Sequence, residues 1–504
     1  MTANLARIFN SGSLYEQLIG QVIAVESQPR LKLKAEQTEH GVYKGVLSDF
    51  ASKTSALDAV LGRLRDPLRS PFAGRAATVA DGAGFTATAT DAAAPGDHAV
   101  RVDRLARADA RLSKRLDDAG TEIAALFVEP GDPGGLFRPP TPDRTVERRF
   151  TVHVAQDDGP PVALDVGYTP PDGATDGDVV AGIATAVNAA AAEARADGRL
   201  AEGTGVAASV LHETDGTSRL SLRGLATGYG HRLSFTDPDG VLAALEVDRT
   251  AVRTGAGGGA VYAVGTGPED SELSAALTLD GLTVYRDANT VDDVLGGVTL
   301  SLTAPTDEAR TLTVGPDTAG MRGEVEAFVK AYNGLQSFLT AKTRVDGETG
   351  DRAAFAGDAS MRALRSGMRT DLARAVPGAG DLGGLAALGL TVERDGRLTI
   401  SDGDALDAAL AARPAQVGAL FGGADGLAAR LERRTEGLTG ADGVIAQRKA
   451  GVDARSRRLD AQIERWDVRL AQREETLRAQ FAQLQEVAAR AQQQQANLGS
   501  LFFI

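Results

Sequence analysis

The chain has 504 residues, which is more than a single hydrophobic core usually holds, so the length predicts several domains. Its 43% hydrophobic and 24% charged residues are typical of folded proteins, and the absence of cysteine excludes disulfides, thiolate metal sites and a cysteine nucleophile. The net charge of −14 is unevenly spread, since residues 71–320 carry 37 Asp and Glu against 20 Lys and Arg. Because an acidic surface repels phosphate backbones, we do not expect nucleic acid as a partner.

The N-terminal part has the apolar period of helices. Apolar residues recur at steps of three and four from Leu14 and Leu18 onward, and Pro29 predicts the point where two helices meet. The second helix carries a heptad seam that ends before the prolines at positions 67 and 71. The seam comprises Tyr43, Val46, Phe50, Lys53, Leu57, Val60 and Leu64, with Lys53 as its one polar interruption.

The middle of the chain is predicted to be mostly β. Short alternating runs begin near Arg75 and are separated by Gly and Pro, and five prolines within residues 129–143 suggest a domain boundary. One helix is expected at residues 179–196, with strands on both sides of it. The glycine-rich residues 255–259 are predicted to form a flexible hinge.

The C-terminal part is predicted to be helical again. Helices are expected from Met321 and from about Ser360, and Asp395-Gly396 predicts the turn of a short hairpin. The last helix, from Val452 to about Leu498, has a heptad seam that needs a partner helix to bury it. The seam comprises Leu459, Ile463, Trp466, Leu470, Leu477 and Leu484.

These patterns predict a multidomain α+β protein that is elongated. Paired N- and C-terminal helices are expected to form a coiled-coil leg, and β-rich head domains are inserted between them. We interpret both seams, including Leu14 and Leu18, as contact surfaces for another protein or another copy. The expected segments are 1–44 and 441–504 for the terminal coiled coil, 45–74 and 316–440 for the leg, 75–128 and 262–315 for the main head domain, and 129–261 for an inserted outer head domain.

The patterns that could indicate a catalytic or ligand site are weak. Gly255, Gly257 and Ala260 match a dinucleotide fingerprint, but a strand rather than a helix is expected after them. Asp237-Pro238-Asp239-Gly240 fits part of a calcium loop, yet a plain turn explains it better. The five histidines show no paired metal spacing and are taken as surface residues, so we expect neither an enzyme nor a bound cofactor.

Several motifs resemble one protein family. Asn289-Thr290-Val291 followed by Gly297-Val298-Thr299-Leu300 is similar to a specific segment of the bacterial flagellar filament cap, the flagellar hook-associated protein 2 family. Further motifs follow in the family's order, at Phe328-Val329-Lys330-Ala331-Tyr332-Asn333, Ala356-Gly357-Asp358, Leu388-Gly389-Leu390, Asp395-Gly396-Arg397-Leu398 and Leu420-Phe421. The opening Ile8-Phe9-Asn10-Ser11-Gly12-Ser13 departs from the family's usual glycine-rich start.

The resemblance implies a non-enzymatic cap at the growing tip of the flagellar filament, required for assembly and motility. The expected partners are further copies in a ring, often a pentamer, together with flagellin, a hook–filament junction protein and an export chaperone. The expected location is extracellular, reached through the flagellar export apparatus without a cleavable signal or membrane insertion. A junction protein, a flagellin and a coiled-coil surface adhesin remain the alternatives, and adhesion could be an added role of the cap.

Overall fold

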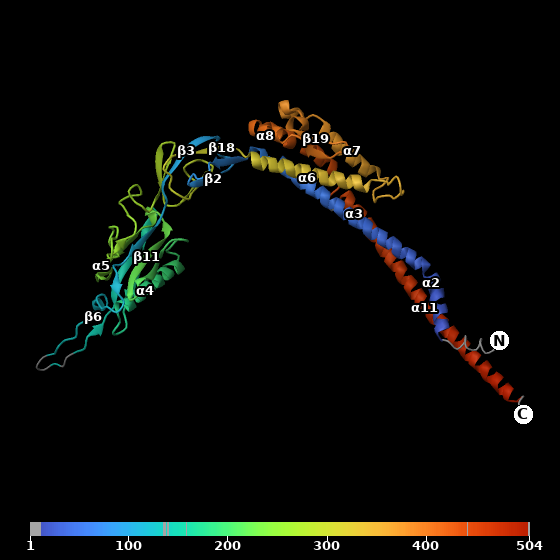
Figure 1. Cartoon of the computed structure of the whole chain (residues 1–504), viewed down its shortest axis with the longest axis horizontal. Coiled ribbons are helices and arrows are strands. Elements are labelled where there is room, and N and C mark those ends of the chain that lie inside the picture. The colour runs from blue at the N-terminus through green and yellow to red at the C-terminus, as the bar shows by residue number, and fades with distance from the viewer. Residues whose placement is uncertain (1–11, 135–137, 139–140, 158, 441, 502–504) are drawn as a thin grey trace. The chain divides into compact units, whose positions relative to one another are not determined.

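The computed structural model describes residues 12–134, 138, 141–157, 159–440 and 442–501, and it divides into two compact units (Figure 1). We call Met1–Ala73 together with Thr318–Ile504 the leg unit, and Gly74–Asp317 the head unit. The head unit is therefore an insertion in the sequence of the leg unit. The multidomain α+β prediction is confirmed, and residues 1–11 of the predicted first segment lie outside the described residues.

Two helices open the leg unit. Helix α2 spans Gly12–Glu26 and α3 spans Gln28–Arg65, so Pro29 lies in the first turn of α3 and the predicted break is confirmed. Proline fits there because its missing N–H would have no partner in a first helical turn. Between the helices, the Ser27 hydroxyl donates to the Ala24 carbonyl at 2.8 Å.

The remaining leg elements pack against the second half of α3. They are η1 Pro71–Ala73, α6 Thr318–Lys342, α7 Ala359–Ala373, η4 Pro377–Leu382, η5 Leu385–Leu388, β19 Leu390–Val392, β20 Leu398–Ile400, α8 Gly403–Ala412, α9 Pro414–Gly422 and α10 Leu427–Thr435. Phe50 of α3 stacks on Phe338 of α6 with ring centroids 6.1 Å apart, and Phe328 of α6 packs edge-on against Phe421 of α9. A single apolar core thus joins the two ends of the sequence within the leg unit.

The predicted hairpin in the leg is confirmed. Strands β19 and β20 pair antiparallel, and Gly396 has a φ of +91°, a conformation that glycine adopts without strain. The Asn333 side chain of α6 donates to the Leu398 carbonyl and accepts from the Leu398 amide, both at 2.7 Å. The buried Tyr332 hydroxyl donates to the Gly396 carbonyl at 3.0 Å, so α6 holds both the strand and its turn.

Helix α11, Val444–Leu501, is the longest element of the leg unit. Its 58 residues correspond to about 87 Å of helix. It begins before the predicted Val452, because Ile445 already packs in the leg core. Among the described residues, no helix combines the length and the apolar character needed to cross a membrane.

The head unit contains an inner module built from the first and last parts of its sequence. One sheet has the strand order β1-β18-β3-β14-β15 and a second has the order β16-β17-β2. Their alternating apolar residues share one core, which includes Val100, Leu277 and Leu300. The strands are β1 Arg75–Val79, β2 Phe85–Ala89, β3 Gly96–Arg104, β14 Ala275–Leu279, β15 Leu282–Arg286, β16 Thr290–Val291, β17 Val298–Leu302 and β18 Arg310–Pro316.

An outer module occupies the middle of the head sequence. Its sheets have the orders β10-β11-β4-β13, with β5 also on β11, and β12-β8-β9, and helix α4, Asp176–Ala196, packs on them. Thr175 and Asp178 form a capping box that starts α4, which confirms the predicted helix. The other elements are β4 Ala108–Leu112, β5 Leu116–Asp117, η2 Ala124–Phe127, β6 Val128–Glu129, β7 Arg144–Thr145, β8 Arg148–Gln156, β9 Gly159–Tyr168, β10 Val206–Thr214, β11 Thr217–Thr227, η3 Tyr229–His231, β12 Leu233–Thr236, α5 Val241–Leu245 and β13 Gly259–Ala260.

Strand β4 belongs to the outer module, although the predicted main head domain included it. It pairs with β11 and β13, and it carries a buried ion pair in which the Arg111 guanidinium donates to both Asp109 carboxylate oxygens, at 2.7 and 3.1 Å. Asp109 also accepts from the Leu233 amide of β12. We therefore propose that the boundary between the two modules lies near Arg107 rather than at residue 128.

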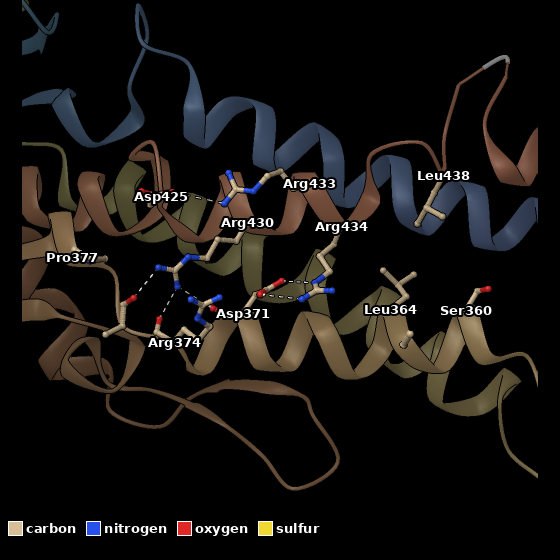
Figure 2. A pocket seen from close by; sticks show the side chains of 12 residues that line it. Ser360, Leu364, Asp371, Arg374, Pro377, Asp425, Arg430, Arg433, Arg434 and Leu438 are labelled. Carbon is tan, nitrogen blue, oxygen red and sulfur yellow. Dashed lines mark hydrogen bonds and ion pairs between the residues drawn. The ribbon is translucent and has the colours of Figure 1, made fainter.

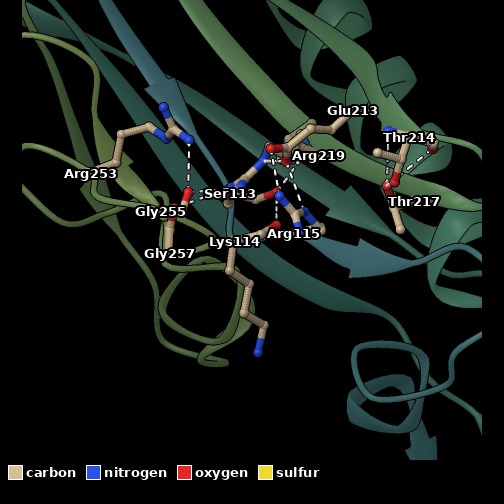
Figure 3. A network of polar contacts seen from close by, with 12 residues as sticks. Ser113, Lys114, Arg115, Glu213, Thr214, Thr217, Arg219, Arg253, Gly255 and Gly257 are labelled. Atoms are coloured by element: carbon tan, nitrogen blue, oxygen red, sulfur yellow. Dashed lines mark hydrogen bonds and ion pairs between the residues drawn. The ribbon is translucent and has the colours of Figure 1, made fainter.

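The glycine-rich segment 255–259 is fixed by hydrogen bonds, contrary to the predicted flexible hinge (Figure 3). The Arg219 guanidinium donates to the carbonyls of Gly255 and Gly257, each at 3.2 Å, and its Nε donates to Glu213 at 2.7 Å. Hydrogen bonds from Arg115 and Arg219 lower the pKa of Glu213 from 4.5 to about 2. Arg219 of β11, held by Glu213 of β10, thus fixes the segment that leads into β13.

The predicted turn at Asp237 is also confirmed. The Asp237 carboxylate accepts from the amides of Val241 and Ala243 and so caps α5. Its two oxygens are engaged with backbone donors, as expected of a turn residue that starts a helix.

Candidate interaction surface on the terminal helices

The N- and C-terminal helices of the leg unit pair antiparallel in one continuous register. Near one end of the pair, Lys44 binds Asp453 at 2.5 Å and Glu36 binds Arg455 at 2.6 Å. Further along come the pairs Gln37–Asp460, Arg30–Asp467, Glu26–Arg473 and Glu16–Arg478. In each pair the two residue numbers add up to nearly the same value, which is the signature of an antiparallel pair without slippage.

Two carboxylates that flank this pair have pKa values below their usual range. The hydrogen bond from Arg455 lowers the pKa of Glu36, and the hydrogen bond from Lys44 lowers the pKa of Asp453. These carboxylates are solvent-exposed, so each pair contributes little stability by itself. These pairs mark the observed register, and the buried apolar residues between the helices provide most of the stability.

Four residues of the predicted C-terminal seam are buried against the chain's own N-terminal helices. They are Leu459, Ile463, Leu470 and Leu477, each no more than 8% exposed. Trp466 is half-buried, and the Arg469 guanidinium lies 5.2 Å from the centroid of its ring. Leu484 lies beyond the point where Tyr15 meets Phe481, and its side chain is 56% exposed.

Most of the predicted seam residues of α3 are buried in the core of the leg unit. Val46, Phe50, Leu57 and Leu64 are buried among α6, α9 and α10. A contact with another protein must therefore use other side chains in this part of the leg. The heptad spacing correctly identified the buried face of α3, but Thr54 rather than the expected Lys53 lies at its polar interruption.

On α2, the row of side chains that contacts α11 differs from the predicted row by one residue. Tyr15 and Ile19 are buried, whereas Leu18, Val22 and Val25 are 40%, 36% and 70% exposed. Leu14 lies in α2, but its side chain is outside the described residues. We call Leu18, Val22 and Val25 the outer stripe, since their spacing of four and three residues aligns them along one exposed helix face.

A cavity borders the outer stripe where α2 gives way to α3. It has a volume of about 600 Å³ and is lined by Val25, Pro29, Trp466 and Arg469, among others. The cavity lies beside the junction of the two helices, since Glu26 ends α2 and Pro29 lies in the first turn of α3. An exposed apolar stripe beside an aromatic residue is the arrangement by which a groove receives a partner helix.

A second groove, between α7 and α10, is lined by arginines (Figure 2). Arg430 donates to the carbonyls of Arg374 and Ala375 at the end of α7, at 2.9 and 2.8 Å, and Arg434 binds Asp371 at 2.6 Å. The Arg430 bonds engage the carbonyls directly after α7, and together with the Arg434–Asp371 pair they hold α10 on α7. We therefore assign this groove a structural role within the leg core.

Two family models match this sequence. The model described as "Flagellar hook-associated protein 2 N-terminus" covers residues 11–109, and the model described as "Flagellar hook-associated protein 2 C-terminus" covers residues 273–493. Together they include all of the terminal helices described above except the last turns of α11.

Similar proteins and structures belong to the same family. The A-type flagellar hook-associated protein 2 of Pseudomonas aeruginosa is 28% identical over 96% of this chain and 94% of its own length. The B-type protein of P. aeruginosa strain PAO1 is 34% identical over 64% of this chain and 68% of its own length. The D1-D2-D3 domains of the flagellar cap protein FliD from Escherichia coli share the fold, with a TM-score of 0.51 and 23% identity over 82% of this chain and 99% of that one.

Proposed function

Because this chain belongs to the flagellar hook-associated protein 2 family and is a flagellar filament cap protein, we propose that it acts at the growing filament tip, where it promotes ordered flagellin polymerisation and prevents flagellin loss. The family is a structural one, and the match over both ends of the chain favours a cap over a junction protein, a flagellin or an adhesin. The observation that supports a direct contact with flagellin is the exposed outer stripe on α2.

The outer stripe is suited to a helix of flagellin. Leu18, Val22 and Val25 present apolar surface along one line, and only the neighbouring face of α2 is used by α11. Fully burying such a side chain contributes about 1.5–3 kcal/mol, so covering these partly exposed residues would contribute roughly 1 kcal/mol each. Contacts of this strength are individually weak, which suits a cap that must release and rebind as each flagellin subunit is added.

The assembled state that we propose is a ring of copies, with five as the expected number. The hook–filament junction protein and an export chaperone are the further partners, and export through the flagellar apparatus is the proposed route to the filament tip. We also propose the division into terminal coiled coil, leg, and inner and outer head domains, with the inner-to-outer boundary near Arg107 as argued above.

A gene deletion with complementation tests the proposed function. Cells that lack the chain should release unpolymerised flagellin into the medium and swim poorly, and the wild-type chain should restore both properties. Electron microscopy of filament tips should then show a terminal structure only in the complemented cells. Normal filaments and motility in the deletion strain would contradict the proposal.

A further inference from the structure

Three side chains that could bind a metal ion converge where the two modules of the head unit meet. Asp157 follows β8 and His231 ends η3 in the outer module, whereas Asp287 follows β15 of the inner module. One ligand atom from each residue lies within 4.8 Å of the other two, and His231 Nε2 is 3.6 Å from Asp157 Oδ1. The side chain of His231 is only 15% exposed, so the predicted surface position of this histidine is wrong.

A glycine turn allows this close approach. A Cβ atom on Gly230 would lie 2.3 Å from Asp287 Oδ2 and 3.1 Å from Asp157 Oδ1, so only glycine fits between the two carboxylates. The Asp287 carboxylate is fixed by the Gly230 amide at 3.1 Å and by the Ser274 hydroxyl at 3.0 Å. Asp287 is therefore a rigid ligand, whereas the Asp157 side chain, 73% exposed, is free to adjust.

The orientation of the histidine points to a cation. His231 Nδ1 lies 2.9 Å from the Thr227 carbonyl, and since a carbonyl can only accept, Nδ1 carries the proton. In the neutral imidazole, Nε2 then keeps its lone pair, and the Asp157 carboxylate lies 3.6 Å from it. A metal ion can bridge such an unprotonated nitrogen and a carboxylate. A backbone carbonyl that fixes the tautomer is also the usual second partner of a metal-bound histidine.

One distance between ligand atoms, together with the surroundings of the site, fits a small divalent ion, and the other two distances are no more than 4.8 Å. Ligand atoms about 2.0–2.2 Å from a tetrahedral zinc ion lie roughly 3.3–3.6 Å apart, which agrees with the separation of Nε2 and Asp157 Oδ1. The site opens into a cavity of about 580 Å³ that also contains Asp292 and Asp293, the latter paired with Arg286. A local excess of carboxylates concentrates cations. One imidazole with two carboxylates is a donor set that favours zinc over calcium.

We propose that Asp157, His231 and Asp287 bind one Zn²⁺ ion, with water completing the coordination. The ion links the end of β8 and the η3 turn to the end of β15, and so it fastens the outer module of the head to the inner module. This is a structural site in the head unit, and it does not depend on the proposed contact of the leg with flagellin.

Zinc titration of the purified full-length, tag-free chain tests this proposal. Isothermal titration in metal-free buffer at pH 7.5 should show one zinc per chain with micromolar affinity, and zinc should raise the melting temperature of the head. His231→Gln and Asp157→Asn should each weaken binding at least tenfold and remove the thermal shift. His153→Gln is the matched control, because His153 bonds to Thr236 elsewhere on the outer module and should leave zinc binding unchanged.

The remaining outcomes are also decisive. No saturable zinc binding by the wild type would overturn the proposal. Undiminished binding by the two variants would place any zinc site elsewhere. If His231→Gln fails to fold, as judged by circular dichroism, the exposed Asp157→Asn variant provides the same test.

Discussion

Tyr15 and Phe481, which lie near opposite ends of the sequence, pack against each other with ring centroids 5.1 Å apart. This contact continues the register set by Lys44 with Asp453 and by Glu26 with Arg473. The two ends of the chain are thus partners within one molecule. We therefore propose the outer stripe, rather than the predicted seam, as the contact surface for another protein.

Leu470→Asp should separate the paired helices. Leu470 is 8% exposed on α11, and an aspartate there must lose its hydration or move the helices apart, at a cost of about 2–5 kcal/mol to the leg unit. Thermal unfolding followed by circular dichroism measures the loss, and flagellin in the medium measures the loss of capping. Val468→Asp, at a position 54% exposed on the same helix, is the control and should have little effect on stability. Equal effects of the two variants would contradict the observed register.

Val22→Asp should impair capping without unfolding the leg. Val22 lies on the outer stripe, so the free chain should change in stability by no more than about 0.5 kcal/mol. Contact with a partner helix would bury the new charge, and capping should therefore fail. Gln17→Asp adds the same charge at an exposed position of α2 outside the stripe and should preserve capping. Normal motility of cells with Val22→Asp would exclude the outer stripe as an interface.

Glu213→Gln should destabilise the head unit in a pH-dependent way. The pKa of Glu213 is lowered from 4.5 to about 2 by Arg115 and Arg219, so its carboxylate stabilises the folded state fully above pH 4.5. This contribution is lost as the pH falls from 4.5 toward 2. The melting temperature of the variant should thus lie below that of the wild type at pH 7, and the two should converge toward pH 2. A difference that stays constant over this range would show that the ion pairs are not its cause.

Asp109→Ala should be strongly destabilising, because it leaves the Arg111 guanidinium buried without its counter-charge. Both side chains are 1% exposed, and removal of one partner of such a pair costs about 3–5 kcal/mol. The double variant Asp109→Ala, Arg111→Met should recover much of this loss, since it leaves no uncompensated charge. Urea denaturation of the three proteins measures the difference. A single variant as stable as the wild type would mean that water reaches Arg111.

The sequence predicted much of the secondary structure because the signals were local. Pro29, the Asp395-Gly396 turn and the apolar period of residues 179–196 each depend on near neighbours, and all three predictions are confirmed. Local sequence signals could not show which face of α2 contacts α11. Apolar residues occupy two adjacent rows of this helix, and the helical period alone does not decide between them.

Features that depend on distant contacts were missed. Strand β4 joins the outer module through its pairing with β11, more than 100 residues later in the chain, and no local pattern indicates this. The ligands Asp157, His231 and Asp287 lack metal-site spacing because the folds of two modules bring them together. The one available signal was the pair of glycines at positions 228 and 230, which permits the approach of Asp287.

Site-specific photo-cross-linking from Val22 tests the central claim most directly. A photoreactive residue at this position, in a chain that caps filaments in living cells, should form a covalent adduct with flagellin, identified by mass spectrometry. The same residue at Gln17 should give little of this adduct. If Val22 yields no flagellin adduct above the level seen from Gln17, or yields only adducts with a second copy of this chain, the account of the outer stripe as the flagellin contact is contradicted.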